Sequence, residues 1–138
     1  MLKKAQDAVE KFTRTFGLPV ATSPKLLEED RVLLRSKWMR EEIEELVLAR
    51  SISEQADAAA DIIYFALGIF VEMGVPGDEI FEIVHNCNMK KVTSTGAIVK
   101  NEEGKVQKPL EWRSPESEIQ QLLFGPDASI IIHDEAND

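Results

Sequence analysis

Apolar residues recur at helical spacing through most of the chain, and four main helices account for them. The first is expected to end at Gly17, and the second to run over residues 27–50. Ser51 and Glu54 fit a capping box, which predicts that the third helix begins near Ser53. This third helix is apolar on nearly every side, so we expect it to be the central one.

The remaining pattern predicts a fourth helix, a small hairpin and a short last helix. The fourth helix is expected over residues 78–91. Residues 96–108 are typical of two short strands around a turn at 101–104, and the last helix is expected over residues 114–125. The expected fold is therefore all-α: an antiparallel four-helix bundle with a small β-hairpin-like segment and a short C-terminal helix.

Two aspartates lie on the helix that should otherwise be buried. Asp61 is the only charged residue between Ala58 and Val71, and Asp57 precedes it by one helical turn. A lone carboxylate in apolar surroundings is costly unless it is paired, protonated or bound to a cation. Asp57 has a plain alternative explanation, because an acid near a helix N-terminus interacts favourably with the helix dipole. Asp61 lies too deep in the helix for that explanation.

Three glutamates on the preceding helix border an apolar face. Glu41, Glu42 and Glu45 fall within about 100° of one another on a helical wheel, and Trp38 and Ala49 share that arc. Acidic clusters on helices are usually solvated faces, but the apolar neighbours argue against that interpretation here. Two facing helices that each offer inward carboxylates describe a site for a hard divalent cation, most naturally Mg²⁺, with Mn²⁺ as an alternative.

Composition and charge narrow the class of protein. With 138 residues, 43% of them hydrophobic, the chain can bury a core as one globular domain, expected over residues 1–125 with a tail over 126–138. The net charge of −9 argues against nucleic acid or an anionic membrane as partner, but allows a small phosphate-bearing ligand if metal ions mediate. The single cysteine, Cys87, excludes an internal disulfide and favours a cytoplasmic location. No signal peptide is recognisable, and the longest apolar stretch, residues 62–71, is too short to span a bilayer.

Five side chains are candidates for binding a substrate. Asn88 and Lys91 share one face near the end of the fourth helix, where Asn can hydrogen-bond a base or sugar and Lys can meet a phosphate. A cap and a cation at a helix end are the plainer interpretation of that pair. Lys105 and Lys108 alternate along a short strand and could either reach phosphates or be solvated edge charges. Trp38 could stack on a base or serve packing alone.

Taken together, the acidic motifs resemble those of the all-α nucleoside triphosphate pyrophosphatases, the superfamily of MazG, dimeric dUTPases and phosphoribosyl-ATP pyrophosphohydrolase. The hallmark of that superfamily is EExxE on one helix and ExxD on the next. The first motif is complete from Glu41 to Glu45. In the second, Asp61 matches the aspartate, but Ala58 stands at the glutamate position and Asp57 is the candidate replacement. Two further segments also look like the MazG-like or phosphoribosyl-ATP pyrophosphohydrolase-like branch: residues 84–91 and 104–109.

The resemblance implies hydrolysis of a nucleoside triphosphate between its α and β phosphates, which gives a monophosphate and pyrophosphate. By similarity, Glu42, Glu45 and Asp61 bind the metal, and Asp57 is a fourth ligand. Glu41 is the candidate to orient or deprotonate the attacking water, and Glu41 and Glu45 could exchange roles. The family-level role is housecleaning of the nucleotide pool, with the base and sugar preference left open. A homodimer or a dimer of dimers is expected, because the third helix is apolar on more sides than a lone small bundle covers.

Two other classes of protein remain in view. A diiron carboxylate bundle needs Glu-x-x-His on two helices, and the sequence supplies it once, as Glu82 and His85. The other histidine, His133, lies in the tail. The second class is a non-catalytic nucleotide sensor with a degenerate metal site, because Ala58 removes one expected carboxylate. The iron content of the purified protein would test the diiron class. Nucleotide binding without pyrophosphate release would indicate the sensor.

Overall fold

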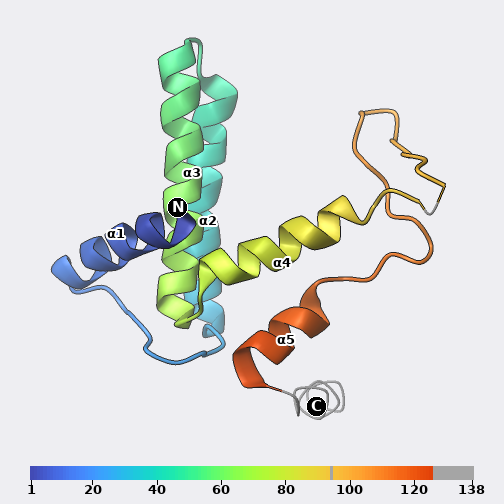
Figure 1. The fold of residues 1–138 in the computed structure, drawn as a ribbon. Coiled ribbons are helices and arrows are strands. Elements are labelled where there is room, and N and C mark those ends of the chain that lie inside the picture. Colours follow the sequence, from blue (N-terminus) through green and yellow to red (C-terminus); the bar gives the residue numbers. More distant parts are fainter. Residues whose placement is uncertain (94, 126–138) are drawn as a thin grey trace. The chain divides into compact units, whose positions relative to one another are not determined.

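The computed structural model describes residues 1–93 and 95–125, and this part of the chain is all-helical, as the sequence predicts (Figure 1). The helices in it are α1 (Leu2–Thr15), α2 (Glu29–Leu48), α3 (Ile52–Met73), α4 (Gly77–Met89) and α5 (Glu116–Phe124). The predicted tail over 126–138 lies outside the described residues. No single helix in the described part is long and apolar enough to cross a bilayer, although α3 and α4 taken together pass that test of length and composition.

Local sequence fixes both ends of α3. Ser51 is its N-cap, and the Ser51 hydroxyl accepts a hydrogen bond from the backbone N–H of Glu54 at 3.1 Å. The Ser51 half of the predicted capping box is therefore confirmed. The Glu54 carboxylate accepts its hydrogen bond, at 2.6 Å, from the backbone N–H of Arg50, one residue before the N-cap. Gly74 ends the helix with a φ of 68°, a left-handed conformation in which glycine carries no Cβ penalty.

The chain divides into two compact units between Gly77 and Asp78. In the first unit α2 and α3 lie side by side and antiparallel, and α1 packs against α3 (Figure 1). The buried cluster of Val9, Leu67 and Val71 joins α1 to α3, so α3 is the central helix of this unit. The predicted four-helix bundle stays a prediction, because all of α4 after its first residue belongs to the second unit.

A buried ion-pair cluster joins α2 to α3. Glu72, which is 3% exposed, accepts hydrogen bonds from Arg31 at 2.6 and 3.2 Å and from Arg35, which is 5% exposed. Burial alone would raise the pKa of Glu72, but the hydrogen bonds and positive charges of both arginines outweigh it, and the pKa is lowered. Gly68 leaves space for this arrangement, because a Cβ there would lie 2.7 Å from Nη1 of Arg35. The helical pattern of the sequence does not indicate this cluster, because its members lie far apart in sequence.

The second unit contains α4, α5 and an irregular segment between them. The indole Nε1 of Trp112 donates to the carbonyl of Cys87 at 2.6 Å and ties this segment to α4. The predicted turn over residues 101–104 forms. Of the predicted strands, however, the described residues contain only one antiparallel bridge, between Lys100 and Val106. A hairpin of two strands is marginally stable on its own, which accounts for the difference.

Candidate active site

Three carboxylates converge where α2 and α3 face each other. Glu42 and Glu45 share one face of α2, since residues three apart are neighbours on a helix, and Asp61 comes from α3. One carboxylate oxygen of each residue lies within 4.8 Å of the other two. Glu42 and Asp61 are half-buried, and Glu45 is exposed. The structure therefore brings together three of the four residues that the sequence analysis names as metal ligands.

Glu42 is the most constrained of the three. Its Oε2 is buried and has no hydrogen-bond partner among the described residues. Burial, followed by the negative charges of Glu45 and Asp61, raises the pKa of Glu42, and the charge of Asp57 acts in the same direction. A buried carboxylate oxygen beside further carboxylates is costly without a counter-charge. A hard divalent cation would supply it, and a donor set made only of oxygens suits Mg²⁺.

The other acidic candidates lie outside this group of three. Asp57 lines a cavity of about 270 Å³ together with Glu45 and Glu54. Ala58, at the glutamate position of the superfamily motif, is 2% exposed and offers no carboxylate. Glu41 is exposed on α2, and the structure does not place it in the group. Within residues 1–93 and 95–125 no histidine joins these carboxylates, so the diiron interpretation gains no support.

Trp38 lies one helical turn before Glu42 on α2 and is half-buried. Its ring centroid is 6.0 Å from that of Phe65. The guanidinium carbons of Arg31 and Arg35 lie 5.8 and 5.7 Å from the Trp38 centroid, within the range of a cation–π contact. A cavity of about 50 Å³ lies beside the ring. Along α2, Trp38 therefore lies between the acidic group and the two arginines that pair with Glu72.

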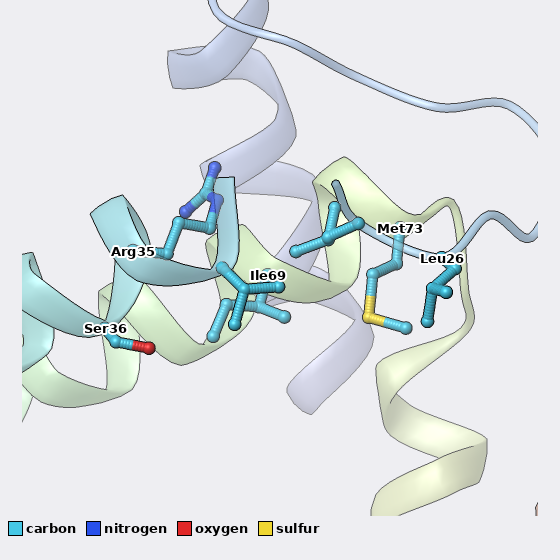
Figure 2. Close-up of a pocket in the computed structure, with 7 residues that line it drawn as sticks. Leu26, Arg35, Ser36, Ile69 and Met73 are labelled. Atoms are coloured by element: carbon cyan, nitrogen blue, oxygen red, sulfur yellow. The ribbon is translucent and has the colours of Figure 1, made fainter. Parts of the chain in front are cut away.

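A larger apolar cavity of about 190 Å³ involves α2, α3 and the segment that leads into α2 (Figure 2). In Figure 2, Arg35 and Ser36 lie at one end of this cavity, and Leu26 and Met73 lie at the other. The remaining lining residues are Leu27, Val32 and Ile69. None of the predicted site residues lines the cavity, so it is separate from the candidate chemistry.

In the second unit, two of the four predicted substrate-binding residues come together. The Nζ atoms of Lys91 and Lys108 lie 5.4 and 4.9 Å from the ring centroid of Trp112. Asn88 is exposed near the end of α4, where its carbonyl accepts a hydrogen bond from the Lys91 N–H at 3.1 Å. Lys105 is exposed, and its backbone closes the 101–104 turn. The sequence pattern did not indicate that an aromatic ring links two of these lysines.

The all-helical fold and the inward carboxylates of α2 and α3 define a member of the all-α NTP pyrophosphatase superfamily. A comparison with known families gives a narrower assignment. Residues 9–88, more than half of the chain, match the family described as phosphoribosyl-ATP pyrophosphohydrolase. The chain therefore belongs to this family.

Among solved structures, the chain is similar to one from Exiguobacterium sp. 255-15 described as "a putative NTP pyrophosphohydrolase". The two chains are 25% identical, the match covers 97% of this chain and 98% of that chain, and the TM-score is 0.43. No curated protein sequence matches the chain significantly. Family membership supports a pyrophosphohydrolase, a hydrolase of phosphoric anhydride bonds.

Proposed function

We propose that the protein hydrolyses nucleoside or deoxynucleoside triphosphates between the α and β phosphates, with Mg²⁺, and releases a monophosphate and pyrophosphate. One observation carries the proposal: Glu42, Glu45 and Asp61 place carboxylate oxygens within 4.8 Å of one another, and Glu42 has a buried oxygen without a partner. A cation at this point would also reconcile a chain of net charge −9 with a polyanionic substrate. The physiological part of the proposal is housecleaning of the nucleotide pool in the cytoplasm.

Each acidic residue has a role in this proposal. Glu42, Glu45 and Asp61 hold the metal, and Asp57 is a fourth ligand. The metal, when bound, neutralises and orients the triphosphate. Glu41, which is exposed and next to Glu42 in sequence, orients the attacking water and accepts its proton, with Glu45 as the alternative base. The water oxygen forms a bond to a phosphorus of the α–β anhydride, the bridging P–O bond breaks, and pyrophosphate leaves.

The remaining predicted site residues belong to substrate binding. The half-buried ring of Trp38 lies one turn from Glu42 and can stack on a nucleobase. Asn88 offers an exposed amide to the sugar or base. The lysines of the second unit, Lys91, Lys105 and Lys108, offer positive charge to the phosphates.

A second copy of the chain is proposed to cover the apolar surface of α2 and α3. Val47 on α2 is 69% exposed, and Ile63 on α3 is 56% exposed. Large exposed apolar patches mark surfaces of association, so a homodimer or a dimer of dimers is expected. Light scattering coupled to size-exclusion chromatography tests this expectation, and a monomer at every concentration would contradict it.

Pyrophosphate release from a panel of NTPs and dNTPs, with Mg²⁺ and with EDTA, tests the proposed activity. Release should require metal, and the other product should be the monophosphate. Glu42→Gln and Asp61→Asn should each lower kcat by about 100-fold or more, because each removes part of the charge that holds the metal. Glu44→Gln is the matched control, since Glu44 is exposed on the same helix and lies outside the group. Unchanged turnover in both site variants would overturn the proposal.

A nucleotide sensor is the second candidate function. The observation that favours it is Ala58, which is buried and supplies no carboxylate where the superfamily motif has glutamate. A sensor would bind nucleotide with Mg²⁺ and release no pyrophosphate. Calorimetric binding alongside the pyrophosphate assay separates the two functions.

A further inference from the structure

Positive charge gathers in one segment of this acidic chain. Residues 90–113 contain six basic and three acidic side chains, a net charge of +3, whereas the whole chain carries −9. All of the segment except residue 94 is described, and it belongs to the second unit. An isolated basic segment in an acidic protein attracts small anions, while the overall charge repels extended polyanions such as nucleic acid.

Trp112 organises two of these charges. Its indole Nε1 donates to the backbone carbonyl of Cys87 at 2.6 Å, so the ring is anchored to α4. Lys91 approaches this ring from the end of α4, and Lys108 approaches it from the segment after the 101–104 turn. Two lysines that are 17 residues apart in sequence therefore share one aromatic platform.

The two ammonium groups lack acidic partners among the described residues. Within the part of the chain that the structure describes, neither Lys91 nor Lys108 forms an ion pair with a carboxylate. The faces of an aromatic ring attract cations, but two cations around one ring still repel each other. An anion that binds both ammonium groups would relieve that repulsion.

We propose that Trp112 is a positioning residue that gathers Lys91 and Lys108 into a subsite for a condensed phosphate. The ligand is the phosphate chain of the substrate or the pyrophosphate product, and this identity rests on the proposed function. Its chemistry fits because a diphosphate or triphosphate carries several negative charges over a short length, which suits two ammonium groups on one ring. The subsite needs no metal and lies entirely within the second unit.

Binding of inorganic tripolyphosphate in EDTA tests this subsite without turnover. Isothermal titration calorimetry on the full chain at low salt should detect saturable binding. Lys91→Met, Lys108→Met and Trp112→Leu should each weaken that binding about tenfold, since each removes or misplaces one charge-assisted contact. Lys100→Met is the matched control, because Lys100 lies in the same segment and is not among the described cations that lie over the Trp112 ring. No binding, or equal weakening by Lys100→Met, would overturn the subsite.

Fluorescence and kinetics give independent readouts. The chain has two tryptophans, so Trp38→Phe leaves Trp112 as the only indole, and its emission should change with tripolyphosphate but not with chloride at equal ionic strength. In turnover, Trp112→Leu should raise KM about tenfold with kcat within about twofold, and Trp112→Phe, which keeps a ring, should recover part of the loss. Metal-free binding of tripolyphosphate by a protein that hydrolyses no nucleotide would contradict the proposed function and support the subsite. Nucleotide hydrolysis with an unchanged KM in all three subsite variants would support the proposed function and contradict the subsite.

Discussion

Replacing Glu72 by glutamine should lower the free energy of unfolding by about 3 kcal/mol. Glutamine keeps the shape of the side chain but leaves Arg35, which is 5% exposed, without a charged partner among the described residues. Removing one partner of a buried ion pair typically costs about 3–5 kcal/mol, because the remaining charge is uncompensated. The lower end applies here, since the Arg31 side chain is 24% exposed and can turn towards water.

Urea unfolding followed by circular dichroism at a fixed protein concentration measures this loss. Glu79→Gln is the matched control, because Glu79 is an exposed acid on α4, and its replacement should change stability by less than about 0.5 kcal/mol. A loss below about 1 kcal/mol for Glu72→Gln would refute the view that this cluster holds α2 to α3.

The native protein and Glu72→Gln should also differ in how their free energy of unfolding depends on pH. The pKa of Glu72 is lower in the folded protein than its ordinary value, because the bonds and charges of Arg31 and Arg35 outweigh burial. The stabilisation is therefore complete above the pKa of the unfolded chain and is lost as pH falls through the lower folded value. Stability curves of the native protein and of Glu72→Gln should converge on acidification. Parallel curves would contradict the assignment.

Three further substitutions probe other parts of the first unit. Gly68→Ala should lower the free energy of unfolding by about 1–3 kcal/mol, although alanine favours helix, because its Cβ would lie 2.7 Å from Nη1 of buried Arg35. Urea unfolding measures this change, and a gain in stability would contradict the prediction. Glu42→Gln should raise the thermal midpoint in EDTA, because burial and acidic neighbours raise the pKa of Glu42 and disfavour its ionised form. The same substitution should remove the stabilisation that Mg²⁺ gives. Scanning fluorimetry with and without Mg²⁺ measures both effects, and a lowered midpoint in EDTA would contradict the first. Gln6→Leu should lower the free energy of unfolding by about 1–2 kcal/mol, because the Gln6 amide makes two hydrogen bonds of 2.9 Å, to the carbonyl of Val75 and from the N–H of Gly77. An unchanged urea midpoint would show that these bonds contribute nothing to stability.

Local sequence rules predict the helices and the convergence of the acids well. Ser51 and Glu54 determine where α3 begins, because both capping hydrogen bonds join residues within 50–54. Glu42 and Glu45 share a face of α2 by periodicity alone, and the short link between α2 and α3 brings Asp61 opposite them. These features depend on residues close together in sequence, which is why the pattern contains them.

Features that depend on residues far apart in sequence could not be predicted in the same way. Glu72 lies near the end of α3, and its partner Arg35 is 37 residues earlier, so neither helical wheel shows that they meet. The strand pattern of residues 96–108 predicts the turn correctly, but a single bridge forms, because strand formation depends on neighbours that the local pattern does not specify. The contact of Lys91 and Lys108 with one ring likewise depends on the path of the chain between them.

The central claim is that the carboxylates of α2 and α3 hold Mg²⁺ for hydrolysis of the α–β anhydride of a nucleotide. Phosphorus NMR of the products formed from a hydrolysed triphosphate, with the native protein and with Asp61→Asn, tests it most directly. The account predicts monophosphate and pyrophosphate in equal amounts, formed only with Mg²⁺ and nearly absent with Asp61→Asn. Diphosphate and orthophosphate, or hydrolysis that continues in EDTA, would contradict it.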